Sequence, residues 1–416
     1  MNFIEELRWR GMLQDMIPGL EDQLAKEMTV AYIGFDPTAP SLHIGNLAAI
    51  MLLKHFQLCG HKPIALVGGA TGMIGDPSGK AAEREFLSED TLRANQIGIQ
   101  KQLEKFLEFH SGANSAEVVN NYDWFKEFSF LGFLREAGKF LTVNYMMSKD
   151  SVKKRLETGI SFTEFSYQLL QGYDFYHLYK NKNVRLQMGG SDQWGNITAG
   201  IDLIRKSLSR SAFGATWPLV TKSDGTKFGK TAGGAVWLDA QRTSPYQFRQ
   251  FWMQMADADV VKYLPQFSLA SMNEVSSLLE THLSDPGKRI AQRTLATELT
   301  VLVHGADAAR DAEAAAEILF GGDPNGATRE ALQAVASEVP NSVVTREELE
   351  DVFGLLARSG VASSTSDARR SVEQGGIKVN GQTLEKGETL ASKGILHDRW
   401  VLVRKGKTTY HVLTLA

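Results

Sequence analysis

Several polar turns of the chain follow short apolar runs and carry residue types that bind anions or small polar ligands. The first turn reads PTAPSLHIGN and places His43 and Gly45 where a helix is about to begin. A helix N-terminus presents unpaired backbone N–H groups and the positive end of the helix dipole, so we expect phosphate there. A lone histidine in a turn is more often simply solvated, so the interpretation of His43 depends on the other segments.

The second turn, in IALVGGATGMIGDPSGKAAER, is rich in glycine but matches neither common nucleotide fingerprint. Its glycines are one residue too close for a P-loop, Ala81 replaces the Ser or Thr that would bind a metal, and G-x-G-x-x-G is absent. A backbone with few side chains lets a ligand press against it. Asp76 is then a candidate partner for an ammonium group, and Lys80 and Arg84 are candidates for phosphate.

A predicted helix, SFTEFSYQLLQGYDFYHLY, carries Tyr167, Gln171 and Asp174 at i, i+4 and i+7. This spacing puts all three on one face, where they can converge on one small polar ligand. The simpler interpretation is an amphipathic helix whose polar stripe faces water, although tyrosine is an unusual choice for such a stripe.

Two further turns have a similar character. In VRLQMGGSDQWGNITAG, the glycines, Gly190 among them, permit close approach of a flat group, and Asp192 could accept hydrogen bonds from a ribose. In TKSDGTKFGKTAGG, Lys222, Lys227 and Lys230 form a cationic loop. Such a loop is either a solvated surface or a phosphate clamp.

The elements that must position these residues alternate between strands and helices up to about residue 220. We predict strands at 30–35, 63–68, 117–120 and 184–188, and helices at 47–58, 88–109 and 195–207. This alternation predicts an α/β fold with a parallel sheet, whose ligands bind beyond the C-terminal ends of the strands. The candidate residues lie in those turns.

The rest of the chain divides into a helical part and a compact tail. We predict a sheet domain at 1–230, a helical domain at 231–320, a linker at 321–346 and a small α+β domain at 347–416. In the tail, SDARRSVEQGG predicts a helix, and two hairpins are expected to turn on Asn380-Gly381 and Lys405-Gly406.

Composition is that of a soluble globular protein of more than one domain. The chain has 416 residues, of which 43% are hydrophobic and 22% charged, and no apolar run approaches membrane-spanning length. A single cysteine, Cys59, excludes an internal disulfide and a cysteine-built zinc site. The opening MNFIEELRWRG does not resemble a secretory signal, so we expect a cytoplasmic protein that does not enter a membrane.

The net charge of −3 conceals an asymmetry between the tail and the body. Residues 352–416 hold ten basic and five acidic side chains, a net +5, which leaves −8 for the remainder. A basic module on an acidic body indicates a polyanionic partner such as a nucleic acid. The expected contact residues lie on the predicted helix and on the second hairpin turn: Arg369, Arg370, Lys405 and Lys407.

Two of the strings resemble a known pair of signatures. PTAPSLHIGN and KFGKT are similar to the HIGH and KMSKS motifs of class I aminoacyl-tRNA synthetases. With YIGFDPT, GGATGMIGDPSGK, FTEFSYQLLQGYDF and LQMGGSDQWGNITAG, the chain resembles bacterial tyrosyl-tRNA synthetases over essentially its whole length. The resemblance implies a Rossmann-like catalytic domain, a helical anticodon-arm-binding domain and a C-terminal RNA-binding domain of the alpha-L type.

The resemblance also implies roles for individual residues, with Tyr32 and Asp174 on the tyrosine hydroxyl. The residues implied around tyrosine are Tyr32, Gly34, Asp76, Tyr167, Gln171, Asp174 and Gln193. Those implied for ATP are Asp36, Gly45, Asn46, Gly190, Asp192 and Lys230. The catalytic residues implied at the phosphates are Thr38, His43, Lys80, Arg84, Lys227, Lys230 and Thr231. Asn46 replaces the last histidine of HIGH, and its amide N–H can also donate to a ribose oxygen.

The reaction implied is the activation of L-tyrosine by ATP to tyrosyl-adenylate and pyrophosphate, followed by transfer of tyrosine to the 3′ terminal adenosine of tRNA(Tyr). The tyrosine carboxylate is already a nucleophile, so the first step needs no general base. No tightly bound cofactor and no protein-held metal is expected, and Mg²⁺ would arrive with ATP. The resemblance also implies a homodimer, formed through residues 125–165.

Three alternatives remain at this stage. A tryptophan-activating relative would be expected to lack the basic tail and to have no reason for Asp174. A non-catalytic RNA-binding protein built on a synthetase would tolerate loss of His43, Asp76 or Lys230, and all three are present. A nucleotidylyltransferase that shares the HIGH turn is disfavoured by the polar helix face and the C-terminal RNA module.

Overall fold

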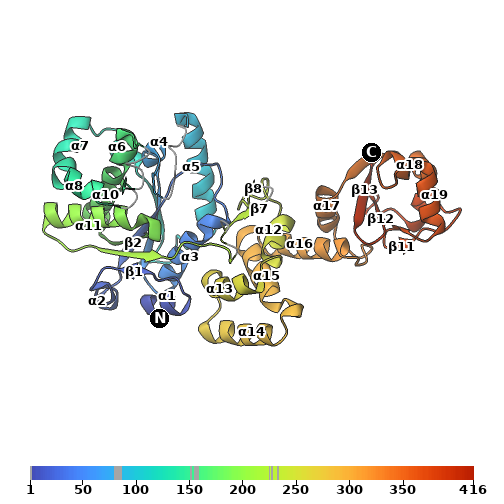
Figure 1. Cartoon of the computed structure of the whole chain (residues 1–416), viewed down its shortest axis with the longest axis horizontal. Helices are drawn as coiled ribbons and strands as arrows, with labels where there is room; N and C mark the ends of the chain where they lie inside the picture. The colour runs from blue at the N-terminus through green and yellow to red at the C-terminus, as the bar shows by residue number, and fades with distance from the viewer. Residues whose placement is uncertain are drawn as a thin grey trace. The chain divides into compact units, whose positions relative to one another are not determined.

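The computed structural model describes residues 2–78, 87–149, 152–153, 159–223, 225, 228–231 and 234–416, with the backbone alone for Lys230 and Thr231. These residues form two compact units (Figure 1). The first unit comprises Met1–Arg242 and Gln254–Leu295, and the second comprises Thr243–Met253 and Ala296–Ala416.

The first unit is built on a sheet of six strands in the order β1-β6-β5-β2-β3-β4. Five of them run parallel, and β1 pairs antiparallel at one edge. The strands are β1 (Asp15–Met16), β2 (Val30–Phe35), β3 (Lys62–Val67), β4 (Glu117–Asn120), β5 (Val184–Gly190) and β6 (Phe213–Trp217). A small hairpin, β7 (Lys230–Thr231) and β8 (Gly234–Ala235), stands apart from this sheet.

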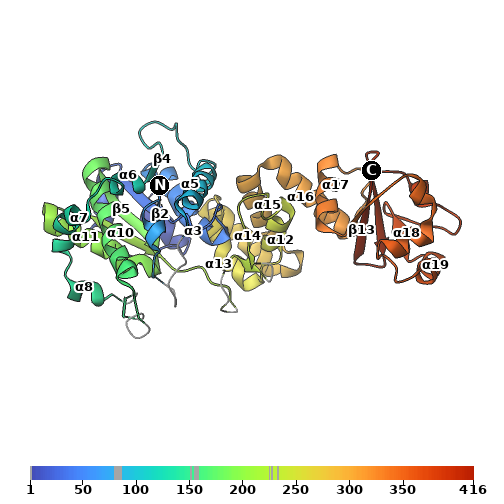
Figure 2. The same ribbon diagram turned by 90° about the horizontal axis from the view of Figure 1, so that it is seen from above.

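Helices cover both faces of the sheet, with α10 and α11 on one side and α3 and α5 on the other (Figures 1 and 2). Because both faces are covered, the central strand β2 is apolar and largely buried, as expected for a parallel sheet. The helices of this unit are α1 (Phe3–Trp9), α2 (Leu20–Lys26), α3 (Ile44–Leu58), α4 (Thr71–Ile74), α5 (Glu89–Leu103), α6 (Tyr122–Phe125), α7 (Phe130–Glu136), α8 (Val143–Met147), α10 (Phe162–Lys182), α11 (Trp194–Leu208), α13 (Asp257–Phe267) and α14 (Met272–Ser284).

The second unit contains a five-stranded sheet in the order β11-β10-β12-β13-β9. Its elements are α12 (Pro245–Met253), α16 (Ala306–Leu319), α17 (Arg329–Glu338), β9 (Asn341–Val344), α18 (Val352–Arg358), α19 (Thr365–Glu373), β10 (Ile377–Val379), β11 (Gln382–Thr383), β12 (Trp400–Lys405) and β13 (Thr409–Leu415). Helix α15 (Ile290–His304) belongs to the first unit up to Leu295 and to the second from Ala296.

The predicted α/β fold is confirmed, with small changes at element ends. The predicted strands at 30–35 and 117–120 match β2 and β4, and the predicted tail hairpins match β10–β11 and β12–β13. Helix α3 starts earlier than expected because His43 occupies the N-cap, where its backbone N–H donates to the Asn46 side chain at 3.1 Å. Helix α5 ends at Leu103, before the predicted Phe109.

The predicted linker at 321–346 is corrected by the structure. This segment contains α17 and β9, and β9 pairs in parallel with β13. Leu332 and Val335 are buried in one cluster with Trp400 and Val412 of the C-terminal strands. The DPNG and VPNS turns suggested a loose connection. The helix between them is short and is stabilised by tertiary packing of its apolar side, which the local sequence does not reveal.

Among the described residues, no helix combines the length and the apolar character needed to cross a membrane.

Candidate functional site

Helix α10 carries three of the predicted ligand-binding residues toward the C-terminal end of the parallel sheet. It begins at Ser161, whose side chain caps the helix by accepting from the Glu164 N–H. Tyr167 and Asp174 are buried and Gln171 is partly buried. A solvated polar stripe is therefore excluded for this face, and the three side chains point into the interior of the first unit.

Asp174 is a fully buried carboxylate with two side-chain donors. Its Oδ2 accepts from the Asn121 amide at 3.0 Å, and its Oδ1 accepts from the Trp124 indole N–H at 2.9 Å. Burial, with a smaller contribution from the nearby Asp36 charge, raises the pKa of Asp174 to about 8 despite the lowering effect of these two hydrogen bonds. Such a carboxyl group can accept a hydrogen bond from a small hydroxyl ligand.

Tyr32 lies on β2 and is only 1% exposed. Its ring meets Phe175 edge-on, with ring centroids 5.6 Å apart. Within the described part of the chain its buried hydroxyl has no hydrogen-bond partner. Burial, with a further contribution from the Asp174 charge, raises the pKa of Tyr32 well above its usual value, so the hydroxyl keeps its proton. A buried unpaired hydroxyl is costly and marks a place for a polar ligand atom.

A chain of hydrogen bonds joins Asp174 to Asp36 at the end of β2. The Asn121 amide that donates to Asp174 also donates to the Thr71 hydroxyl at 3.0 Å, and Thr71 donates to Asp36 at 2.9 Å. The Tyr167 hydroxyl donates to the other oxygen of Asp36, also at 2.9 Å. A side chain at Gly68 would place its Cβ 2.2 Å from Asp36 Oδ1, so the glycine permits this arrangement.

A second chain of hydrogen bonds contains the other predicted tyrosine-site residues. Gln193 donates to Asp76 at 2.7 Å and accepts from Gln171 at 3.2 Å. Gln171 in turn accepts from Asn196 at 2.9 Å. Tyr167 lies in the field of Asp36, Asp76 and Asp174, and burial followed by these three charges raises its pKa well above its usual value. Three carboxyl groups around one small space favour a cationic ligand such as an ammonium group.

Four further predicted residues lie in or just beyond β2 and β5: Gly34, predicted for tyrosine, Thr38, predicted at the phosphates, and Gly190 and Asp192, predicted for ATP. Gly34 and Thr38 are exposed, and Gly190 closes β5. Asp192 follows it, and burial, then the Asp76 charge, raises the pKa of Asp192. The structure therefore brings the residues predicted for tyrosine and those predicted for adenosine to the same end of the parallel sheet, as expected for an open α/β fold.

The turn that contains His43 is supported by α5. Gln102 of α5 accepts from the Leu42 N–H at 2.8 Å and donates to the Ser41 hydroxyl at 2.9 Å. Asn95 donates to the carbonyl of Pro37 at 2.9 Å. Both amides are buried, so they fix the backbone that leads into the helix N-terminus. That N-terminus presents Gly45 and Asn46 beside His43.

The backbone that follows the predicted cationic loop lies against the same turn. The Val236 carbonyl accepts from the Ile44 N–H at 2.9 Å, and Leu238 donates to the Leu42 carbonyl at 2.9 Å. His43 and Trp237 form an isolated antiparallel bridge. The backbone just after the KFGKT motif is thus joined to the HIGN turn, and Val236 also donates to the Gly229 carbonyl within that motif at 3.0 Å. Lys80, Arg84 and Lys227 lie outside the described residues, as do the side chains of Lys230 and Thr231.

The four predicted tRNA-contact residues lie on the second unit. Arg369 stacks over the Phe353 ring at 5.2 Å, and Lys407 is exposed at the β12–β13 turn. Arg370 and Lys405 both contact Asp367, at 3.2 and 2.6 Å. These contacts hold the carboxylate charged, so the pKa of Asp367 lies far below its usual value.

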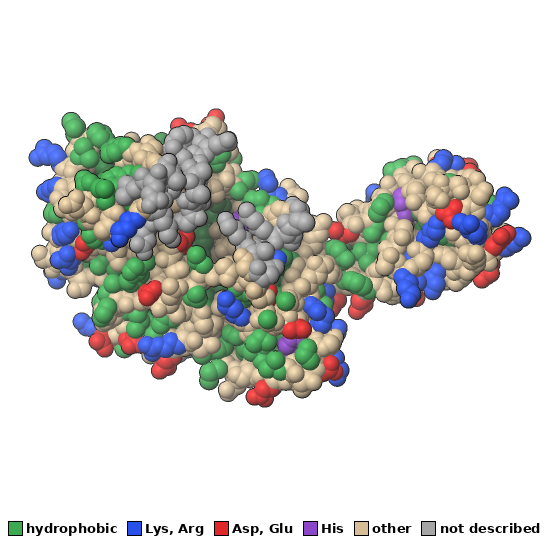
Figure 3. Space-filling view, viewed as in Figure 1, with side chains coloured by type: hydrophobic (Ala, Val, Ile, Leu, Met, Phe, Trp, Pro, Cys, Tyr) green, Lys and Arg blue, Asp and Glu red, His purple; other side chains and the backbone are tan. Residues whose placement is uncertain are grey.

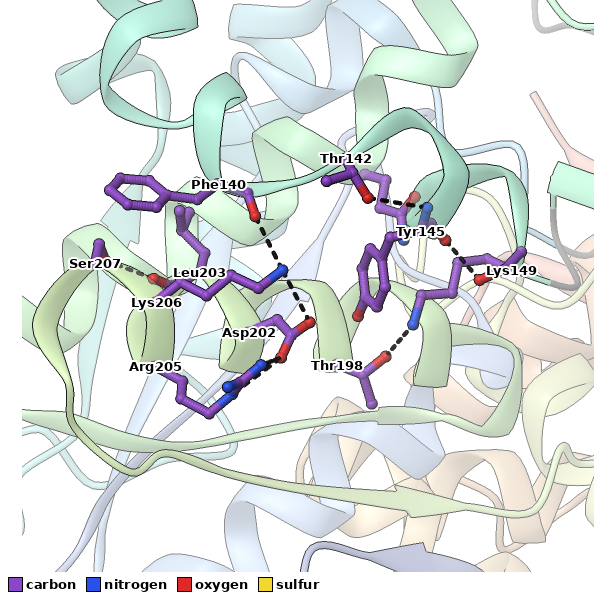
Figure 4. A network of polar contacts seen from close by, with 12 residues as sticks. Phe140, Thr142, Tyr145, Lys149, Thr198, Asp202, Leu203, Arg205, Lys206 and Ser207 are labelled. Atoms are coloured by element: carbon purple, nitrogen blue, oxygen red, sulfur yellow. Dashed lines mark hydrogen bonds and ion pairs between the residues drawn. The ribbon is translucent and has the colours of Figure 1, made fainter.

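A separate polar network joins the end of α8 to α11 (Figure 4). Lys149 donates to Thr198 at 3.0 Å and lies 3.9 Å from the Tyr145 ring. Lys206 lies 5.3 Å from the same ring and donates to the Phe140 carbonyl at 3.0 Å. Burial lowers the pKa of Lys149. These contacts fasten α8 to the helix that begins immediately after Gln193.

Sequence reasoning missed the residues that support the pocket rather than line it. Thr71, Asn121, Trp124 and Asn196 hold Asp36, Asp174 and Gln171 in place. Asn121 and Trp124 follow β4 in the string NNYDW, one strand away from β3. Their position beyond a predicted strand was the only available signal. It was a weak one, because polar residues are also common in turns that bind no ligand.

The chain is similar to known proteins over nearly its whole length. A family model described as "tRNA synthetases class I (W and Y)" matches residues 24–321, and a "Tyrosine--tRNA ligase SYY-like C-terminal domain" matches residues 330–413. The tyrosine–tRNA ligase of Cytophaga hutchinsonii is 54% identical over 99% of both chains. That of Bacteroides fragilis is 51% identical over 99% of both.

Solved structures agree with this result. A C-terminally truncated mitochondrial tyrosyl-tRNA synthetase of Aspergillus nidulans is similar with a TM-score of 0.70 and 31% identity, and the match covers 77% of this chain and 94% of that one. The corresponding truncated enzyme of Coccidioides posadasii gives a TM-score of 0.66 at 32% identity, over 75% and 91% of the two chains.

Proposed function

The chain belongs to the tyrosine–tRNA ligases of the class I tRNA synthetases, and from this membership we propose how its own residues perform the reaction. Its function is that of a tyrosine–tRNA ligase: it activates tyrosine with ATP and transfers it to tRNA. The observation that carries the proposal is the buried hydroxyl of Tyr32 beside the buried carboxyl of Asp174.

We propose that Tyr32 and Asp174 bind the phenolic hydroxyl of tyrosine. The hydroxyl would donate to Asp174 and accept from Tyr32, which supplies the partner that Tyr32 otherwise lacks among the described residues. Phenylalanine would leave the buried Tyr32 hydroxyl without this partner and would give Asp174 no donor beyond Asn121 and Trp124. Tyrosyl-tRNA synthetases are themselves the usual example of this effect. Discrimination would then need no separate editing site.

The α-ammonium group of tyrosine is assigned to Asp76, Tyr167, Gln171 and Gln193. Asp76 supplies the charge, and Gln193 links it to Gln171 through hydrogen bonds of 2.7 and 3.2 Å. Because these side chains already hold one another, little rotational freedom is lost when the ligand arrives. Gly34 on β2 leaves space beside the ring of the substrate.

ATP is assigned to the ends of β2 and β5 and to the start of α3. Asp36, Gly190 and Asp192 would face the adenosine, and Thr38, His43, Gly45 and Asn46 the ribose and phosphates. The Asn46 oxygen accepts from the His43 N–H at 3.1 Å, so the amide N–H₂ group is the part of this side chain that would serve as a donor. That group can donate to the ribose in place of the histidine found in HIGH.

Catalysis in this proposal is positioning and charge neutralisation. The tyrosine carboxylate attacks the α-phosphorus of ATP, the bond between the α-phosphorus and the α,β-bridging oxygen breaks, and pyrophosphate leaves with that oxygen and the bonding electrons. Lys80, Arg84, Lys227, Lys230 and Thr231 would hold the departing pyrophosphate. We propose that ATP enters as its Mg²⁺ complex, so the metal comes with the substrate.

We propose that the second unit binds tRNA(Tyr) through Arg369, Arg370, Lys405 and Lys407. Several Lys and Arg side chains are visible on this face of the C-terminal strands and helices (Figure 3). They would contact phosphates and so position the tRNA without reading its sequence. The protein would act in the cytoplasm.

We further propose that the protein is a homodimer. Large apolar side chains are exposed along α7, α8 and the start of α10: Phe130, Leu131, Leu134, Val143, Met147 and Phe162. Leu131 is 71% and Phe162 is 69% exposed, and hydrophobic side chains gather over α7 in Figure 3. Exposed apolar clusters of this kind mark protein interfaces.

The test of the proposed function is ATP–pyrophosphate exchange with tyrosine, tryptophan and phenylalanine, each offered separately to the purified chain. Exchange that depends on tyrosine alone supports the assignment of the pocket. Exchange that depends on tryptophan, or no exchange with any of the three, would refute it.

A further inference from the structure

Helix α13 reaches the segment that carries the predicted catalytic lysines. Asp259 of α13 is buried, and its Oδ1 accepts from the backbone N–H of Ser223 at 2.8 Å. One helical turn later, the Tyr263 hydroxyl accepts from the Thr221 N–H at 3.0 Å and donates to the Thr221 carbonyl. Because residues i and i+4 share one helical face, both side chains bind the same short stretch of backbone, at Thr221 and Ser223.

The same helix also holds the far side of this segment through aromatic packing. Phe228 is buried, with its ring centroid 4.8 Å from that of Tyr263 and 5.7 Å from that of Phe267. The Phe228 and Phe267 rings are nearly parallel, at 9°. Tyr263 therefore contributes both a polar anchor at Thr221 and an apolar wall for Phe228.

Immediately after Phe228 the backbone meets the turn that contains His43. Gly229 has φ of +80°, and a Cβ there would lie 3.0 Å from the Gly45 nitrogen. The Gly229 carbonyl accepts from Val236, whose own carbonyl accepts from Ile44. A side chain at residue 229 would therefore both strain the backbone and push the two motifs apart.

Helix α13 supports the His43 turn as well, because it packs against α3, the helix that His43 caps (Figure 1). In sequence, α13 follows α12, yet it belongs to the same compact unit as the parallel sheet. One helix thus contacts both the segment with the lysines and the helix that starts at the HIGN motif. In the described part of the chain, the hydrogen bonds and ring contacts of Asp259 and Tyr263 involve neither Tyr32 nor Asp174, so these two side chains stand apart from amino-acid recognition.

We propose that Asp259 and Tyr263 are positioning residues for adenylate formation, which hold the lysine-bearing segment in register with the His43 turn. Neither side chain is assigned to a substrate. Fixing both ends of a loop reduces the conformational freedom that its cations must lose when pyrophosphate charge develops. The proposal rests on the proposed roles of Lys227 and Lys230. It adds a role for helix α13, which binds described residues of the same segment.

The alternative is that α13 merely stabilises the fold. The two accounts differ in what the variants change. If the role is purely structural, removal of an anchor would lower thermal stability and weaken tyrosine binding and exchange together. If the role is positioning, removal would lower the exchange rate while tyrosine affinity stays near the wild-type value, since the tyrosine pocket does not touch Asp259 or Tyr263 in the described residues.

The experiment compares Asp259→Ala, Asp259→Asn and Tyr263→Phe with the wild type in the full-length protein. Asp259→Ala removes the acceptor of the Ser223 N–H, whereas Asp259→Asn keeps an oxygen there. Tyr263→Phe removes the Thr221 anchor but keeps the ring under Phe228. Asp257→Ala is the matched control, because Asp257 is an acid on the same helix whose partners are Gln292 at 2.7 Å and His282 at 3.4 Å rather than residues 221–231.

We expect Asp259→Ala and Tyr263→Phe to slow tyrosine-dependent exchange by about ten- to a hundredfold, with tyrosine affinity changed by less than about twofold. Asp259→Asn should recover most of the rate. Trypsin cleavage after Lys222, Lys227 or Lys230 should become about fivefold faster in the two anchor variants, as expected when one buried hydrogen bond is removed. Asp257→Ala should match the wild type in all three measurements.

Wild-type exchange and wild-type cleavage in both anchor variants would overturn the proposal, and so would parallel losses of rate and tyrosine affinity. Because Tyr263→Phe preserves ring packing, it keeps the test decisive if Asp259→Ala fails to fold. Lys230→Ala distinguishes a failure of the proposed function from a failure of this inference. If Lys230→Ala exchanges normally, the role assigned to the lysines is wrong. Faster trypsin cleavage of the Asp259 and Tyr263 variants would still show that these side chains anchor the segment.

Discussion

The indole N–H of Trp124 donates to Oδ1 of Asp174 across 2.9 Å, and so orients the carboxyl group that we assign to the substrate hydroxyl. Trp124→Phe removes this donor and keeps an aromatic ring. We expect a higher KM for tyrosine and weaker discrimination against phenylalanine, by about tenfold, with the KM for ATP unchanged. Steady-state exchange kinetics with both amino acids measure this.

The matched control for that substitution is Trp9→Phe. The Trp9 indole also donates to a carboxylate, Glu6 at 2.8 Å, but it lies on α1, outside the pocket. If the two variants changed tyrosine kinetics equally, the effect would be one of general stability, and the orienting role of Trp124 would be wrong.

The stability of the ligand-free protein should depend on pH through Asp174. Burial raises its folded-state pKa to about 8, whereas an unfolded aspartate titrates near 3.9. Between these values the folded state binds more protons than the unfolded chain, so the free energy of unfolding falls as pH rises from about 4 to about 8. Asp174→Asn removes the titration and should flatten this decline.

Urea unfolding across that pH interval measures the difference. Glu104→Gln is the control, since Glu104 is an exposed acid. An Asp174→Asn variant that lost stability with pH as steeply as the wild type would show that the carboxyl is already ionised in the folded protein.

Lys230→Ala should slow adenylate formation while tyrosine affinity stays nearly intact. No side chain of the KFGKT loop is assigned to the amino acid, and a cation there matters mainly as charge builds on the departing pyrophosphate. Single-turnover adenylate formation and equilibrium tyrosine binding separate the two effects. A large fall in affinity with an unchanged rate would mean that the loop has been misassigned.

Alanine at Arg369, Arg370, Lys405 and Lys407 should weaken tRNA binding and flatten its salt dependence, by about one unit of slope for each phosphate that is no longer neutralised. Tyrosine-dependent exchange should remain. The control set neutralises four exposed lysines of the first unit: Lys26, Lys101, Lys105 and Lys180. Equal losses of affinity in the two sets would mean that net charge, rather than this surface, sets the affinity.

A truncation after the predicted linker is a poorer test of the same point. Trp400 and Val412 share a core with Leu332 and Val335 of α17, so removal of residues 352–416 would expose an apolar surface. Loss of activity in such a fragment could follow from misfolding alone. The four substitutions leave that core intact.

The residues that were predictable from sequence are those whose type and spacing are compatible with only a few structures and functions. Tyr167, Gln171 and Asp174 share a helical face, and His43 and Gly45 begin a helix, so local periodicity was enough to select them. The parallel sheet followed from the alternation of strands and helices. Resemblance supplied the roles, which residue spacing alone left open.

The supporting residues were not predictable, because their importance depends on tertiary contacts. Asn121 matters only because β4 lies next to β3 and brings it against both Thr71 and Asp174. Asp259 reads as an ordinary acid in the first turn of a helix, and only its hydrogen bond from Ser223 distinguishes it. The α17 helix was read as part of a linker because it is short and flanked by turn signals.

The most direct test of the account is amino-acid discrimination by Tyr32→Phe, measured as the ratio of kcat/KM for tyrosine to that for phenylalanine in ATP–pyrophosphate exchange. The buried Tyr32 hydroxyl, without a partner among the described residues, is assigned to the substrate hydroxyl alone. The account predicts that the ratio falls, through loss of activity with tyrosine, while activity with phenylalanine is unchanged or higher. An unchanged ratio, with tyrosine and phenylalanine affected equally, would contradict it.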